Sequence, residues 1–90
     1  EQTPHLWKEQ EHTLCRSFVF PTFLTAIDFV NEVAALSEKH HHHPNISVDY
    51  RCVGLSLSTH DDGNIVTEKD HELARAIDLL YRSNKRYATS

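Results

Sequence analysis

Several features that often reveal a protein's class are missing from this sequence. It has no methionine, no CxxC pair, and no apolar run close to the roughly 20 residues that span a bilayer. We therefore expect no membrane partner. Cys15 and Cys52 stand far apart, and we see no secretory leader, so we interpret both as reduced side chains.

The sequence also lacks an excess of positive charge. It has 9 Lys and Arg residues against 13 Asp and Glu residues, which gives a formal net charge of −4. Proteins that bind nucleic acid through a basic face have the opposite balance. We therefore expect no direct nucleic-acid partner, and expect a small neutral molecule or another protein instead.

The missing methionine bears on location. An unprocessed gene product starts with methionine, whereas this sequence starts with Glu1, so we expect further residues upstream. We expect a cytoplasmic protein, with an organelle as the alternative because a targeting segment could precede Glu1.

What is present indicates a small globular chain. Apolar residues make up 39% of the 90 residues and charged residues 24%. We expect one domain over residues 1–90, with an irregular N-terminal flank over residues 1–13. A chain this short buries a modest fraction of its surface, which favours oligomerisation.

The periodicity of apolar residues predicts the secondary structure. Alternating polar and apolar side chains predict strands over residues 14–20, 46–50 and 53–58. Stripes of apolar residues at helical spacing predict helices over residues 21–41 and 68–87. The predicted fold is therefore α+β, a single-layer antiparallel sheet in the order β-α-β-β-α with both helices on one face.

Local signals refine this fold. Pro21 suits the first turn of the first helix, and Thr67 with Asp70 resembles a capping box at the start of the second. Arg51-Cys52 is expected to join the last two strands. The predicted buried stripe of the first helix includes Phe23 and Ala34, with Phe29 on its border. Open sheet edges and the apolar stripe of the second helix predict a homodimer or homotetramer.

The most informative segment is the histidine run, His40 to His43, which ends at Pro44. An unperturbed imidazole titrates near pH ~6.5, so it can both give and take a proton in neutral water. Glu38 lies four residues before His42, and at helical spacing these two side chains share a face. We therefore expect Glu38 to orient His42.

Besides a purification tag, which the internal position of the run before a hairpin argues against, the run has three competing interpretations. His40 and His41 suit a solvated helix end, where histidine interacts well with the helix dipole. A zinc site needs three or four converging ligands, whereas consecutive residues of a helix point about 100° apart, so we expect no functional metal. The third interpretation is acid/base catalysis by His42 and His43 with a third histidine from the hairpin.

The order of these residues resembles one family closely. The pattern runs Arg16-x-Phe18-x-Phe20-x-x-Phe23-x-x-Ala26-x-x-Phe29, then Glu38-x-x-x-His42-His43-Pro44, Thr59-His60, Gly63 and Asp70-x-x-Leu73-Ala74. This is similar to the pterin-4a-carbinolamine dehydratase family, also known as the dimerisation cofactor of a transcription factor. The resemblance covers about Trp7 to Tyr81.

The resemblance implies an enzyme that dehydrates 4a-hydroxytetrahydropterin to quinonoid dihydropterin, in tetrahydrobiopterin recycling, without a metal or organic cofactor. It implies the following roles. The catalytic residues are His42, His43 and His60; the substrate-binding residues are Glu38, Pro44, Ser58, Thr59 and Asp61; and Asp70 is structural near the site. The alternative is a non-catalytic scaffold of the same fold, a transcriptional coactivator or an assembly factor with a protein partner.

Two departures from the family pattern concern substrate contact. The segment from His60 to Asp70 is one residue longer than the family spacing, and Asn45-Ile46 replaces the acidic and aromatic residues common after the proline. We therefore expect the contacts with the substrate to differ from those of other family members.

Overall fold

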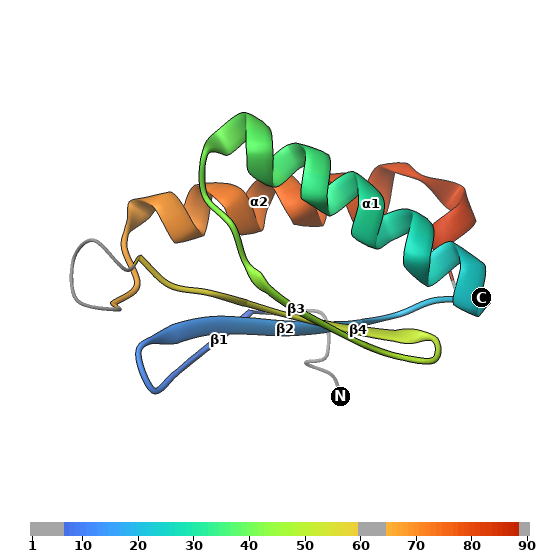
Figure 1. The fold of residues 1–90 in the computed structure, drawn as a ribbon, viewed down its shortest axis with the longest axis horizontal. Helices are drawn as coiled ribbons and strands as arrows, with labels where there is room; N and C mark the ends of the chain where they lie inside the picture. The colour runs from blue at the N-terminus through green and yellow to red at the C-terminus, as the bar shows by residue number, and fades with distance from the viewer. Residues whose placement is uncertain (1–6, 60–64, 89–90) are drawn as a thin grey trace.

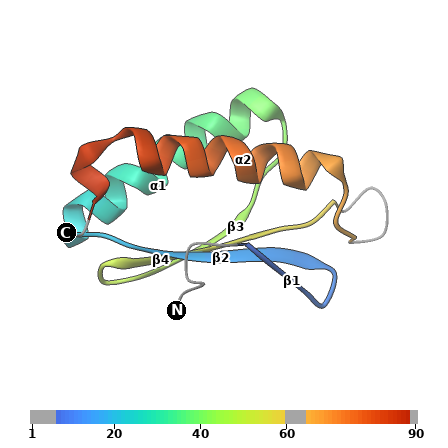
Figure 2. The ribbon, with the colours of Figure 1, turned by 180° about the vertical axis from the view of Figure 1, so that it is seen from behind.

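The computed structural model describes residues 7–59 and 65–88 and consists of a four-stranded sheet and two long helices. Its elements are β1 (Lys8–Gln10), β2 (Thr13–Val19), α1 (Phe23–His40), β3 (Asn45–Asp49), β4 (Cys52–Leu57), α2 (Glu68–Ser83) and a 3-10 helix, η3 (Lys85–Tyr87). The sheet is antiparallel, with the strand order β1-β2-β4-β3. Figures 1 and 2 show both helices on the same face of this sheet, which confirms the predicted α+β class.

The N-terminal flank was predicted to be irregular, and this is wrong for residues 8–10. These residues form β1, which pairs with β2 in the register Gln10 to Thr13. The two strands are joined by Glu11 and His12, with φ angles of 49° and 67°. Tight hairpins that need positive φ usually contain Gly, Asn or Asp, so this turn lacks the usual sequence signal. The sheet has four strands instead of the expected three.

The hairpin between β3 and β4 is confirmed, but its turn begins one residue earlier than predicted. Asp49 pairs with Cys52, so Tyr50 and Arg51 form the loop. Tyr50 has a φ of 55° and is exposed, although its place in the alternating pattern put it on a strand. The turn geometry, which fixes the register of a hairpin, overrides that pattern here.

Helix α1 begins after its N-cap, Thr22, whose hydroxyl oxygen accepts a hydrogen bond from the Thr25 N–H. Capping by Thr satisfies one of the free donors of the first turn. Pro21 therefore precedes the cap. The prediction that Pro21 lies in the first turn of the helix is wrong.

The buried face of α1 is centred on Phe29, which the sequence pattern placed at the border of the stripe. Phe29 is fully buried and its ring lies 5.0 Å from that of Phe18 and 4.9 Å from that of Phe20. Phe23 and Ala34, which were predicted on the buried stripe, are exposed. The helix is thus rotated about its axis from the predicted orientation, because the rings of Phe18 and Phe20 pack on Phe29.

The core fills the space between the helices and the sheet. Its buried apolar residues come from β2 and the segment after it, from β4, from both helices and from η3: Leu14, Phe18, Phe20, Ala26, Phe29, Val33, Val53, Leu55, Leu57, Leu73, Ala74, Ile77 and Tyr87. Within the described ranges, no helix is long and apolar enough to cross a bilayer.

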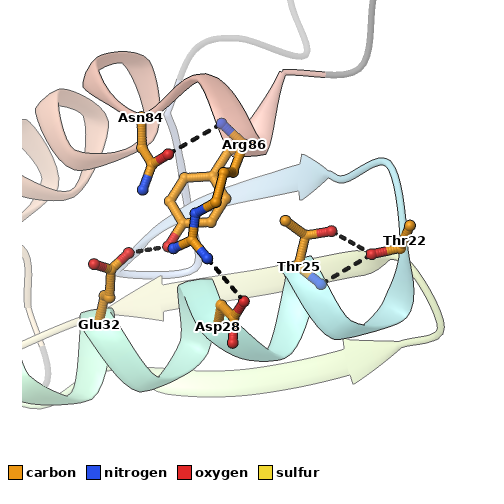
Figure 3. A network of polar contacts seen from close by, with 7 residues as sticks. Thr22, Thr25, Asp28, Glu32, Asn84 and Arg86 are labelled. Carbon is orange, nitrogen blue, oxygen red and sulfur yellow. Dashed lines mark hydrogen bonds and ion pairs between the residues drawn. The ribbon is translucent and has the colours of Figure 1, made fainter.

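Helix α2 ends at Ser83, four residues earlier than predicted. Asn84 leaves the helical region, with φ −113° and ψ 111°, and its side chain accepts a hydrogen bond from the Arg86 N–H. This local contact competes with the helix and starts η3 instead. As Figure 3 shows, Arg86 then reaches Asp28 of α1 at 3.2 Å. Tyr87 also donates a hydrogen bond to Glu32 of α1, so the C-terminal turn is fixed to the first helix.

Candidate active site

The C-terminal end of α1 and the N-terminal end of α2 lie at the same end of the sheet, next to the end of β4 (Figure 1). Three side chains of the sequence pattern meet here: His42 after α1, Thr59 after β4, and Asp70 in the first turn of α2, while the neighbouring His43 pairs with Glu38. Three separate segments therefore contribute to one site.

The end of α1 is a Schellman motif. His41 adopts the left-handed conformation, with φ 54° and ψ 38°. Its N–H donates to the Glu38 carbonyl at 3.2 Å, and the His42 N–H donates to the Ser37 carbonyl at 3.1 Å. These are the two hydrogen bonds that define the motif. The chain turns sharply at His41, so His42 has already left the helix.

The predicted pairing of Glu38 with His42 is wrong. His42 Nε2 lies 2.5 Å from Asp70 Oδ1, while Glu38 Oε2 lies 2.5 Å from His43 Nε2. The prediction assumed four-residue helical spacing, and the left-handed turn at His41 breaks that spacing. Each histidine thus has a carboxylate of its own.

The two pairs differ in exposure. The side chains of His42 and Asp70 are 13% and 0% exposed, whereas those of His43 and Glu38 are 60% and 76% exposed. Water screens an exposed ion pair strongly, and holding two mobile side chains together costs entropy. The His42 pair is therefore the more rigid of the two.

The Asp70 carboxylate accepts hydrogen bonds from three residues, His42, Thr59 and Thr67. Its Oδ2 accepts hydrogen bonds from the Thr59 hydroxyl and from the Thr67 N–H, both at 2.9 Å. The second contact confirms the Asp70 half of the predicted capping box. Burial by itself raises the pKa of Asp70, but the hydrogen bonds from His42, Thr67 and Thr59 outweigh it and hold the pKa below the usual value of an aspartate.

Thr59 is more deeply buried than its predicted place beside a substrate suggests. It is 2% exposed, and its hydroxyl contacts both Asp70 and the Thr67 hydroxyl, the latter at 2.7 Å. Thr67 had not been predicted as a site residue, although its place in the capping box was a signal for it. Ser58 and Pro44 are half-buried, and their roles stay predictions. His60 and Asp61 lie outside the described residues.

The arrangement suits proton exchange. An imidazole paired with a buried carboxylate has a fixed orientation. Across residues 7–59 and 65–88, no three histidine, cysteine, aspartate or glutamate side chains converge as a metal ion would require. In the described part of the site, the groups that can do chemistry are the two imidazoles and their carboxylates.

The sequence matches one known family over most of its length. A family model described as pterin 4 alpha carbinolamine dehydratase matches residues 1–80. A protein of Mycobacterium leprae (strain Br4923), provisionally named a pterin-4-alpha-carbinolamine dehydratase, is 49% identical over 75 residues, which are 82% of this chain and 78% of the relative. A protein of Thermomicrobium roseum with the same provisional name is 46% identical over 71 residues, 79% of this chain and 75% of the relative.

Two solved structures are also similar. A transcriptional coactivator/pterin dehydratase from Brucella melitensis has a TM-score of 0.77 and 36% identity, over 82% of this chain and 80% of that one. A pterin dehydratase-like protein described as a RuBisCO assembly factor in the alpha-carboxysome has a TM-score of 0.71 and 30% identity. The match covers 84% of this chain and 89% of that one. From its sequence and its fold, this chain belongs to the pterin 4 alpha carbinolamine dehydratase family.

Proposed function

We propose that this protein removes water from 4a-hydroxytetrahydropterin, giving quinonoid dihydropterin. The observation that carries the proposal is the pair formed by His42 and the fully buried Asp70, at 2.5 Å, next to a second histidine with its own carboxylate. An imidazole that is held in place by a carboxylate can act as the general acid or base that the dehydration needs. Family membership supports the choice of substrate.

The reaction needs two proton transfers. Hydroxide is a poor leaving group, so an acid must protonate the C4a hydroxyl oxygen as the C–O bond breaks. The lone pair of the neighbouring ring nitrogen forms the new double bond, and a base takes the proton from that nitrogen. Water leaves, and no metal or organic cofactor takes part in the proposed reaction.

Within this proposal, His42 and His60 share the acid and base roles. His43, paired with Glu38, holds the pterin, and Pro44, Ser58 and Asp61 border it. His60 follows Thr59 directly in the chain, and the Thr59 hydroxyl lies 2.9 Å from the carboxylate that holds His42. In the cell, the reaction would return the oxidised cofactor of aromatic amino-acid hydroxylases to a reductase.

The alternative is a scaffold without catalysis. The two similar structures are described as a coactivator/dehydratase and as an assembly factor, so this fold also occurs in proteins described by their partners. A scaffold has no need of a buried carboxylate that holds a histidine. The His42 pair therefore favours the enzyme, and a partner protein remains the second candidate.

The test generates the hydroxylated pterin with a hydroxylase and follows its dehydration spectroscopically, with and without the protein. The proposal predicts an acceleration that is proportional to protein concentration and saturates with substrate. A rate equal to the uncatalysed rate at every protein concentration would contradict it and favour the scaffold. A protein of similar size and charge serves as the control for nonspecific effects.

We also propose that the protein forms a homodimer or homotetramer. Between α1 and α2 lies a hollow of about 610 Å³ whose apolar wall includes Leu36, Leu79 and Leu80, and Leu79 is 61% exposed. In the described sheet, β3 is hydrogen-bonded on one side only, to β4. An exposed apolar helix face and an open strand edge are both surfaces on which a second copy can pack.

A further inference from the structure

The two oxygens of the Asp70 carboxylate have different partners. Oδ1 faces His42 Nε2 at 2.5 Å, while Oδ2 receives the Thr59 hydroxyl and the Thr67 N–H, each at 2.9 Å. An ionised carboxylate accepts hydrogen bonds and donates none. Every group around Asp70 must therefore be a donor.

This requirement fixes the direction of the hydroxyl contacts. Thr59 has a single O–H, and that hydrogen points to Asp70 Oδ2. The contact of 2.7 Å between the Thr59 and Thr67 hydroxyls then needs Thr67 as the donor. The result is an ordered chain of hydrogen bonds from Thr67 through Thr59 to Asp70.

The same requirement fixes the proton on His42. Because Asp70 Oδ1 can only accept, His42 Nε2 must carry a hydrogen. In the neutral ring one nitrogen carries the hydrogen and the other is a free acceptor, so Nδ1 is the free one. The partner of one ring nitrogen thus decides which atom of the ring is available for chemistry.

We propose that Thr59 is a positioning residue: its hydroxyl orients Asp70, Asp70 holds the hydrogen on His42 Nε2, and Nδ1 is the atom that exchanges protons with the substrate. The last step rests on the proposed dehydratase function, whereas the first two do not. Thr59 is 2% exposed, so water cannot easily replace its hydroxyl when it is removed.

The first test observes the ring directly, by nitrogen NMR of protein labelled with ¹⁵N in its histidines. The pH is raised until the histidine signals no longer change, and the two nitrogens of each neutral ring then report which one carries the hydrogen. The inference predicts that His42 is hydrogenated at Nε2 in the unmodified protein. A His42 signal with the hydrogen on Nδ1 would overturn it, without any variant being needed.

Variants then test the part played by Thr59. Thr59→Val removes the hydroxyl with little change of shape, and we expect a mixture of the two His42 forms; Thr59→Ser keeps the hydroxyl and should restore the single form. Thr25→Val is the matched control, since it removes one hydroxyl of the Thr22–Thr25 pair at the opposite end of α1 (Figure 3). A spectrum of Thr59→Val identical to that of the unmodified protein would contradict the role of Thr59.

The activity assay tests the link to catalysis. We expect kcat to fall about tenfold in Thr59→Val with KM unchanged, the size of effect that loss of one buried hydrogen bond gives. Thr59→Ser should recover kcat to within about twofold. An unchanged kcat in a variant whose His42 form has changed would overturn the link. If the unmodified protein had no dehydratase activity but showed the Nε2 form, the positioning would be supported and the proposed function would fail.

Discussion

His42 and His43 are neighbours in the chain, but they lie in different environments. His42 is 13% exposed and paired with a carboxylate that water does not reach, whereas His43 and its partner Glu38 are largely in solvent. Electrostatic interactions are stronger and geometry is better defined where water is excluded. His42 therefore has the fixed orientation that the proposed proton transfer requires, whereas His43 is freer to move.

Matched carboxylate variants measure this difference. Asp70→Asn should lower the free energy of unfolding by about 3 kcal/mol, because it breaks a buried, hydrogen-bonded pair. Glu38→Gln should change it by about 0.5 kcal/mol or less, because its pair is exposed. Urea unfolding of the two variants beside the unmodified protein gives both values. Equal effects of the two substitutions would show that burial does not separate the pairs.

The lowered pKa of Asp70 predicts how stability depends on pH. A carboxylate whose folded pKa is depressed stabilises the fold above its ordinary value, 3.8, and loses this contribution as the pH falls towards the folded pKa. The stability difference between the unmodified protein and Asp70→Asn should therefore shrink as the pH falls below about 4. Unfolding measured in steps across this range tests it. A difference that grows as the pH falls would contradict the direction of the shift.

At the scale of elements, the Schellman motif at the end of α1 decides where the site residues go. A left-handed residue at this place is usually glycine, and His41 occupies it here with φ 54°. The turn separates Glu38 from His42 and directs His42 towards α2. The helix end is thus the reason why His42 and His43, which are neighbours in the chain, pair with two different carboxylates.

Glycine substitutions at adjacent positions test the motif. His41→Gly should raise the free energy of unfolding by about 1 kcal/mol, because glycine adopts the left-handed conformation without steric cost. His40→Gly, at the last residue of the helix, should lower it by up to about 1 kcal/mol, the cost of glycine in a helix interior. Thermal and urea unfolding of both variants measures the two effects. A loss of stability in His41→Gly would mean that this residue is not left-handed in solution.

The sequence pattern was sufficient for elements with strong periodicity and insufficient where an unusual residue makes a turn. The alternation in β2 and β4 predicted these strands closely, and the stripe of α2 predicted the start of that helix but not its end. The turn at Glu11-His12 and the cap at His41 carry no glycine or asparagine, so β1 and the pairing of His42 with Asp70 were missed. Both errors have one physical origin, because positive φ angles at ordinary residues are set by the surrounding structure and have no local signal.

For the whole molecule, both helices pack on one face of the sheet. Residues of both helices line an apolar hollow. The sequence predicted self-association from an open edge and an apolar stripe. In the structure Leu79 on α2 is an exposed apolar side chain, and we propose that the association takes place there. A chain of 90 residues buries a modest share of its own surface, so packing against a second copy would add to its stability.

Light scattering tests the proposed association. The unmodified protein should have the mass of a dimer or tetramer, and Leu79→Glu should shift it towards the smaller species, because a charge on an apolar interface costs desolvation energy. Arg82→Glu, on the same helix but outside the lining of the hollow, is the control. A monomeric mass for the unmodified protein at all concentrations would remove the proposal.

The central claim, that the histidine held by Asp70 carries out the dehydration, has one most direct test. The dehydration rate of the hydroxylated pterin is compared for His42→Ala and for His40→Ala, which removes an exposed histidine two residues earlier. Loss of a general acid or base lowers a rate by roughly two to four orders of magnitude, and we predict this for His42→Ala and a nearly unchanged rate for His40→Ala. Full activity in a folded His42→Ala protein would contradict the account.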